Sequence, residues 1–89
     1  MPMDDAYLRR ISEVIGTAPT LRDAAAIWRE RDPETRVLLV DAMDMRDETA
    51  ALQLGQRRVY LATSDGHCWR VTQQPAEATA LILTQEEPP

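Results

Sequence analysis

The sequence predicts an α+β domain, in which two N-terminal helices pack on a small, mainly antiparallel sheet of three or four strands. Three observations indicate this class. Apolar residues recur at helical spacing before residue 31, a short apolar run lies at 37–40, and residues 57–72 hold two β-rich runs around an Asp-Gly pair. The 89 residues suffice for one domain, expected over residues 4–84 and followed by a frayed acidic and proline tail at 85–89.

Two helices are expected in the first third of the chain. An aspartate at position 4 or 5 can cap the first helix, and Gly16 is a natural C-terminal stop. Thr20 caps the second helix, which the Asp32-Pro33 pair ends. The residues that form the two buried stripes are Tyr7, Leu8, Ile11, Val14 and Ile15, then Leu21, Ala24, Ala25 and Trp28.

The rest of the chain is expected to build the sheet. Residues 36–41 are interpreted as a strand buried on both faces, because four apolar residues follow one another in a run too short for a helix. Residues 49–54 are interpreted as a helical turn, and residues 75–78 as another that begins with a proline. The run at 79–84 could continue that helix or form a further strand, and its β-rich composition favours the strand.

The clearest local signal is a β-hairpin over residues 57–72, with its turn at Asp65-Gly66. A three-residue loop would pair Leu61 with Trp69 and would separate apolar from mixed side chains cleanly. One face would then hold Val59, Leu61, Trp69 and Val71, and the other Tyr60, Ala62, Cys68 and Arg70. If the first face packs on the helices, the second is left as an exposed, partly apolar patch for a protein partner or a homodimer, with Arg70 stacked on Tyr60.

The composition excludes several classes of protein. A net charge of −5 argues against direct binding to nucleic acid, but it allows a basic protein partner or a surface that imitates nucleic acid. A single Cys excludes an internal disulfide and fits a reducing cytoplasm. There is no apolar run of about 20 residues and no signal-peptide pattern at the start, so we expect a cytoplasmic protein without a membrane association.

The stretch 41–48 is the first candidate for chemistry, because it holds Asp44, Asp47 and Glu48 beside two methionines. It lacks the central Gly of calcium loops, and no Gly-rich phosphate cradle occurs in the chain. The plain interpretation is a solvated acidic surface with Arg46 paired among the acids. The functional alternatives are a protein-docking surface, with Met43 or Met45 exposed, and a cation site.

No catalytic signature is present. His67 and Cys68 are neighbours in an expected strand and therefore point to opposite faces, which disfavours a catalytic or metal-binding pair. No Ser lies in a Gly-x-Ser-x-Gly turn. We therefore expect no enzyme activity and no cofactor, and we single out His67, Cys68 and Asp44 as candidates for a ligand or metal role.

The pattern from Val37 to Thr84 combines an acidic turn with Val59-Tyr60-Leu61, His67-Cys68 and Pro75-Ala76-Glu77-Ala78. In these features the chain resembles a family of short bacterial proteins encoded in nitrogen-fixation gene clusters. Trp69 and the Met-Asp-Met-Arg-Asp turn depart from that pattern. The resemblance implies an accessory role near nitrogenase or its assembly, with no established activity, and it singles out His67, Cys68 and Asp44.

The first functional hypothesis is thus a non-enzymatic cytoplasmic accessory protein that binds a partner through the acidic loop and the hairpin face with Tyr60, Cys68 and Arg70. A second hypothesis is an acidic inhibitor of a nucleic-acid-binding machine, of the phage anti-defence type, which requires acids clustered on one face at phosphate spacing. A third is a metal- or redox-linked role for His67 and Cys68.

Overall fold

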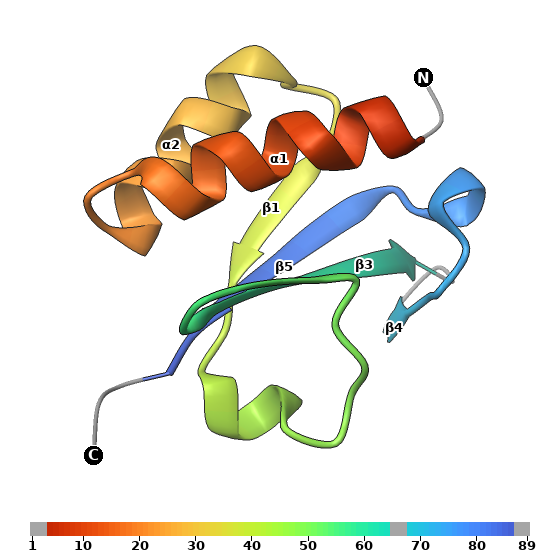
Figure 1. Cartoon of the computed structure of the whole chain (residues 1–89). Helices are drawn as coiled ribbons and strands as arrows, with labels where there is room; N and C mark the ends of the chain where they lie inside the picture. Colours follow the sequence, from red (N-terminus) through yellow and green to blue (C-terminus); the bar gives the residue numbers. More distant parts are fainter. Residues whose placement is uncertain (1–3, 65–67, 87–89) are drawn as a thin grey trace.

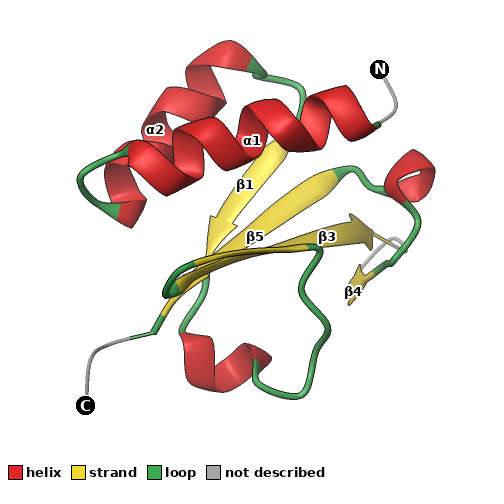
Figure 2. Cartoon of the chain, in the orientation of Figure 1, coloured by secondary structure: helices red, strands yellow, loops and turns green. Residues whose placement is uncertain are grey.

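The computed structural model describes residues 4–64 and 68–86, and its two helices form one layer over a sheet of five strands (Figures 1 and 2). The elements in chain order are α1 (Asp5–Thr17), α2 (Leu21–Arg31), β1 (Arg36–Leu39), the 3-10 helix η1 (Ala42–Met45), β2 (Leu52–Leu54), β3 (Arg57–Ser64), β4 (Trp69–Val71), the 3-10 helix η2 (Pro75–Glu77) and β5 (Ala80–Gln85). The α+β class predicted from the sequence is confirmed.

The sheet has the order β1-β5-β3-β2, and β4 pairs with the far end of β3 on the same side as β2. Only β1 and β5 run parallel, and the other three pairings are antiparallel. The sheet is therefore mainly antiparallel, as expected, with one strand more than the largest number expected. The run at 79–84 forms β5, which lies at the centre of the sheet between β1 and β3.

Both helices begin where their capping residues predict. The side chain of Asp4 accepts a hydrogen bond from the Tyr7 N–H at 2.9 Å, and that of Thr20 accepts one from the Asp23 N–H at 3.0 Å. The predicted stop at Gly16 is wrong, because α1 continues through Thr17. The helix ends at Ala18, whose backbone turns extended before Pro19, as a residue that precedes proline prefers.

Side chains pack on both faces of the sheet. Between the helices and the sheet lies the larger core, whose members with no exposed surface are Ile11, Ile15, Ala24, Ala25, Val59, Leu81 and Leu83. A smaller cluster covers the opposite face and consists of Met45, Tyr60, Ala62, Ala80 and Ile82. The segment between β1 and β2, which contains η1, folds back over this second face (Figure 1).

Two predicted elements differ from the structure. β1 is only partly buried on its two faces, because Val37 packs in the larger core and Leu38 against the smaller cluster, whereas the Leu39 side chain is 42% exposed. Residues 49–54 do not form a helical turn. They contain β2, which runs into a tight turn at Gly55, where φ is +67°, and then pairs with the start of β3.

The hairpin register also differs from the prediction. Ser64 pairs with Trp69 and Ala62 with Val71, a shift by an odd number of residues that turns the β4 side chains to the opposite faces. Val71 therefore packs in the Tyr60 cluster, while Arg70 lies opposite Thr63. The stacking of Arg70 on Tyr60 is ruled out by this register. The turn at Asp65-Gly66 lies outside the described residues.

The C-terminal tail begins later than predicted. Gln85 is the last residue of β5, and its side-chain Oε1 accepts a hydrogen bond from Arg57 Nε at 3.1 Å. Glu86 forms an ion pair with Arg58 at 3.2 Å. Residues 85 and 86 are thus part of the sheet and its edge contacts rather than of a frayed end.

Candidate functional site

The acidic loop, residues 41–48, is fixed to the sheet at its first half. Asp41 caps η1, since its Oδ1 accepts a hydrogen bond from the Met43 N–H at 2.9 Å. The side chain of Met45 is buried against the second face of the sheet. Tyr60, on β3, donates its hydroxyl to the Met45 carbonyl at 3.3 Å. The loop therefore has a side-chain anchor and a main-chain anchor at the same residue.

The end of the loop and the residues that follow it are held by further hydrogen bonds. The Glu48 N–H donates to the Met45 carbonyl at 3.0 Å, which closes the turn after η1. Gln73, just after β4, donates its Nε2 to the Thr49 carbonyl at 3.1 Å. The Ala51 N–H then bonds the Val59 carbonyl at 2.8 Å and leads the chain into β2. The loop is thus anchored to the sheet at Met45, and the residues directly after it are held at Thr49 and Ala51.

The side chains that the acidic loop presents to solvent are acidic, with one large apolar group. Asp44, Asp47 and Glu48 are all exposed, and Met43 is the most exposed large hydrophobic residue among those described, at 67%. Arg46 is exposed too and forms no ion pair with any other described residue, so the expected pairing with its acidic neighbours is absent there. The loop therefore presents three acidic side chains and one methionine to solvent.

A groove of about 640 Å³ lies beside the acidic loop, between the start of α2 and the ends of β1 and β5. Its apolar wall consists of Leu21, Val40, Ala42 and Met43, and its charged or polar rim of Asp41, Arg46, Gln85 and Glu86. The exposed methionine therefore forms part of the apolar wall of an open groove with a charged rim, a setting in which an adaptable side chain can contact a partner.

The predicted exposed patch on the hairpin is not formed. Tyr60 is 1% exposed and Ala62 is fully buried, because the segment that carries the acidic loop covers this face. Cys68 and Arg70 are exposed, but Arg70 lies on the side of the sheet opposite Tyr60. The structure therefore places Tyr60 and Arg70 on opposite faces of the sheet, and the buried Tyr60 bonds the acidic loop through its hydroxyl.

Within the part of the chain that the structure describes, no three His, Cys, Asp or Glu residues come together in a group that could hold a metal ion. Asp44 is exposed and belongs to no such group. His67 lies outside the described residues, so the predicted separation of His67 and Cys68 is not described either.

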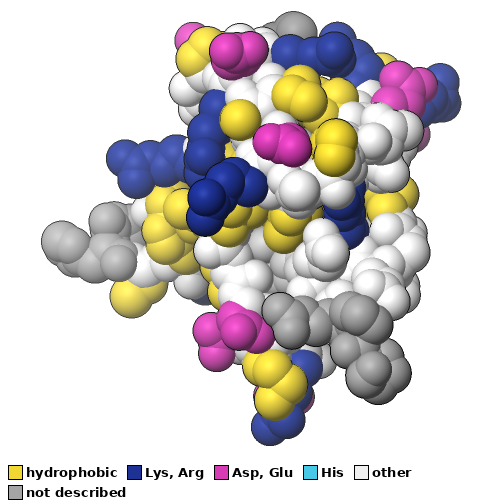
Figure 3. Space-filling view, turned by 90° about the vertical axis from the view of Figure 1, so that its left-hand side faces the viewer, with side chains coloured by type: hydrophobic (Ala, Val, Ile, Leu, Met, Phe, Trp, Pro, Cys, Tyr) yellow, Lys and Arg dark blue, Asp and Glu magenta, His cyan; other side chains and the backbone are white. Residues whose placement is uncertain are grey.

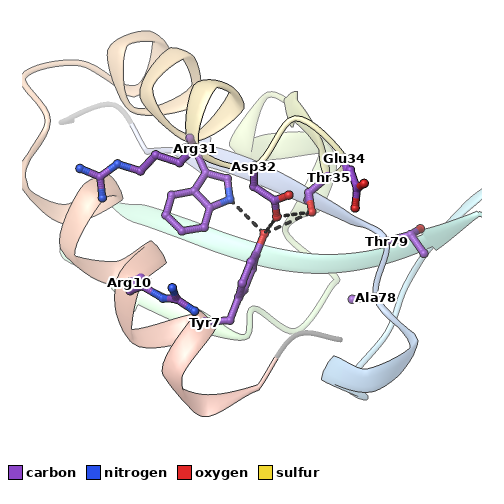
Figure 4. A pocket seen from close by; sticks show the side chains of 9 residues that line it. Tyr7, Arg10, Arg31, Asp32, Glu34, Thr35, Ala78 and Thr79 are labelled. Carbon is purple, nitrogen blue, oxygen red and sulfur yellow. Dashed lines mark hydrogen bonds between the residues drawn. The ribbon is translucent and has the colours of Figure 1, made fainter. Parts of the chain in front are cut away.

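A second hollow, of about 470 Å³, was not predicted from the sequence (Figure 4). It is lined by Tyr7, Arg10, Trp28, Arg31, Asp32, Glu34, Thr35, Ala78 and Thr79. At its centre the Tyr7 hydroxyl donates to Asp32 Oδ2 at 2.6 Å and accepts from Trp28 Nε1 at 3.0 Å. Thr35 donates to the same carboxylate oxygen at 2.6 Å. The only sequence signal was the Asp32-Pro33 helix stop, three residues before that threonine.

The electrostatics of this network favour a structural role. Burial, aided by the hydrogen bond to the Asp32 carboxylate, raises the pKa of Tyr7 above its usual value. Burial also acts to raise the pKa of Asp32, but hydrogen bonds from Thr35, Tyr7 and the Glu34 N–H outweigh it and bring that pKa below its usual value. Near neutral pH the phenol stays protonated and the carboxylate ionised, so neither group is poised to transfer a proton.

The surface charge is mixed on the face seen in Figure 3. Acidic side chains lie apart from one another there, among basic and apolar ones. Nucleic-acid mimicry needs a continuous row of acids, and this face does not offer one.

Comparison with known proteins returned no match of this chain to a family model, to a curated protein or to a solved structure. Among the described residues, no helix is long and apolar enough to cross a membrane.

Proposed function

We propose that this chain is a small, non-enzymatic binding protein that captures a basic surface of a protein partner through the acidic loop. The observation that carries the proposal is the fastening of this loop. Its backbone is tied to the sheet at Met45 through Tyr60, and Gln73 holds the Thr49 carbonyl directly after the loop, while Asp44, Asp47 and Glu48 remain exposed. Ordered contact groups lose less conformational entropy when a partner binds, so a fixed loop favours recognition.

The chemistry of the loop indicates how such a partner is recognised. Three exposed carboxylates attract Lys and Arg side chains over a distance and raise the rate of encounter. Met43 and the neighbouring groove then supply apolar contact area that adapts to the partner's shape. In this proposal Tyr60 positions the loop rather than touching the partner, whereas the exposed Cys68 and Arg70 stay outside the main contact.

The resemblance over residues 37–84 suggests where to look for this partner. It makes a component of nitrogenase or of its assembly in the bacterial cytoplasm the first candidate. The nucleic-acid-mimic hypothesis is less favoured, since the acids on the face seen in Figure 3 are dispersed. The hypothesis of a metal or redox role involves His67, which lies outside the described residues.

The test is a binding assay with the purified chain as bait in lysate from nitrogen-fixing cells, followed by an affinity measurement with the captured protein. Asp44→Asn/Asp47→Asn/Glu48→Gln should weaken binding roughly tenfold, since each rim charge contributes about 0.5 kcal/mol. The loss should be largest at low salt, where charges are least screened.

The matched control neutralises three exposed acids elsewhere, Glu13→Gln/Glu30→Gln/Glu77→Gln, so that the net charge changes equally. This variant should bind like the original chain. An equal loss in both variants would mean that only net charge matters, and undiminished binding by the loop variant would place the contact on another surface. Either result contradicts the proposal.

A further inference from the structure

The outer edge of β1 carries backbone groups that the sheet leaves free. Among the described residues β1 pairs only with β5, in parallel (Figure 2). The N–H of Val40 bonds the Leu83 carbonyl, and alternate residues of a parallel strand point the same way. Val37 and Leu39 therefore direct their N–H and carbonyl groups away from the sheet, towards the open edge.

Among the described residues, one side chain from the helix layer forms a hydrogen bond with this edge. Arg29, on α2, donates to the Val37 carbonyl at 2.6 Å, which agrees with the outward direction of that group. The main-chain groups of Leu39 are not covered in this way, and its side chain is 42% exposed. The edge is thus half covered, with an apolar residue at its open half, and such an edge is a template for a further strand.

The charges at the two ends of this edge are opposite. The Arg29 guanidinium stands at the Val37 end, and the exposed Asp41 follows Leu39 at the other end. Asp41 is four positions after Val37, which is about 13 Å in an extended chain. A strand that docks here with complementary charge must therefore carry an acidic group opposite Arg29 and a basic group opposite Asp41.

A second copy of β1 meets this requirement. We propose that two copies of the chain pair through their β1 edges, antiparallel and about a two-fold axis at Leu39, so that Val37 of each copy lies opposite Asp41 of the other. This symmetry brings Arg29 of each copy beside Asp41 of the other, and it places the two Leu39 side chains on the same side of the joined sheet. The inference concerns a different surface from the three acids of the acidic loop and does not depend on the partner proposed for them.

The experiment measures the mass of the full chain in solution by light scattering, from micromolar to submillimolar concentration. The expected mass at the higher concentrations is that of two chains. Leu39→Pro should give a monomer, because it removes an outward N–H that the pairing with β5 does not use. A monomer at every concentration for the original chain would overturn the proposal, and Arg29 would then act as protection of a free edge.

Charge reversal tests the antiparallel arrangement and does not depend on the proline variant folding. Arg29→Glu alone and Asp41→Arg alone should each weaken the dimer roughly tenfold or more, since like charges then face each other across the axis. Mixing the two variants should restore a heterodimer, because both charge pairs become opposite again. Arg9→Glu, an equal charge change on an exposed position of α1, should leave the dimer intact.

Two results would contradict this geometry. One is a dimer that neither Leu39→Pro nor Arg29→Glu weakens, which would place the contact elsewhere. The other is a failure of the mixed variants to associate although each is folded, as judged by thermal unfolding. Neither result bears on the acidic-loop assay, because that assay uses different substitutions and detects a different protein.

Discussion

The phenol of Tyr7 connects three segments that lie far apart in the sequence. It comes from the first turn of α1, accepts from Trp28 on α2 and donates to Asp32 in the turn before β1. The Tyr7 and Trp28 rings also meet edge to face, with centroids 5.3 Å apart. One hydroxyl thus ties both helices to the connection that enters the sheet.

Tyr7→Phe should lower the free energy of unfolding by about 1–2 kcal/mol, because it leaves the indole N–H of Trp28 without its acceptor and removes one donor to Asp32. Thermal or urea unfolding measures the loss. Ser12→Ala is a control, since that hydroxyl bonds only the Arg9 carbonyl of its own helix. A Tyr7→Phe variant as stable as the original chain would mean that the network contributes nothing net.

Arg57 joins two elements, the C-terminus of α1 and strand β3. Its guanidinium donates to the carbonyls of Ile15 and Ala18, both at 2.7 Å, and of Pro19 at 3.1 Å. The last carbonyls of a helix have no partner within the helix, and a cation there also offsets the negative end of the helix dipole. This contact fixes α1 against the sheet at the end opposite to Tyr7.

Arg57→Met should therefore cost about 2 kcal/mol of unfolding free energy, and Arg57→Lys should recover only part of it, because an ammonium cannot present the same planar fork. Arg58→Met is the matched control on the neighbouring position. It removes only a partly exposed ion pair with Glu86 and should cost less than about 1 kcal/mol. Equal losses at both positions in urea unfolding would contradict the role assigned to Arg57.

The elements that local chemistry specifies could be predicted from the sequence, and those that depend on distant partners could not. The caps at Asp4 and Thr20 act within their own first turns and were placed correctly. The hairpin register depends on Val71 joining Tyr60 in a cluster that the loop at 41–48 completes, and no residue of the hairpin encodes that loop. The same covering loop explains why Tyr60 could not be recognised as buried.

At the scale of the whole molecule, the two faces and the two edges of the sheet differ in the segments that cover them. The helices cover one face of the sheet, the segment with the acidic loop covers the other, and the β1 edge stays open (Figure 1). The β2 and β4 strands divide the opposite edge between them. Two of the exposed large apolar side chains, Leu39 and Met43, flank the connection that leaves β1, which directs both proposed contacts to that side of the chain.

The Tyr7 network should also make the free energy of unfolding depend on pH, with a plateau near neutral pH and a loss on both the acidic and the alkaline side. The pKa of Asp32 lies below its usual value of about 3.9, so its contribution is complete above that pH and is lost as the pH falls through the folded-state pKa. The pKa of Tyr7 is raised above its usual value of about 10. Its contribution is therefore complete below that pH and is lost as the pH rises through the folded-state pKa.

Urea unfolding across the pH range tests both limits with single substitutions. Asp32→Asn should flatten the acidic side of the profile, and Tyr7→Phe the alkaline side, while each variant is less stable than the original chain between them. Asp44→Asn serves as the acidic control, because that carboxylate is exposed and belongs to no network among the described residues. If Asp32→Asn left the acidic slope unchanged, other carboxylates would govern acid unfolding, and the network would be a geometric tie without an electrostatic share in stability.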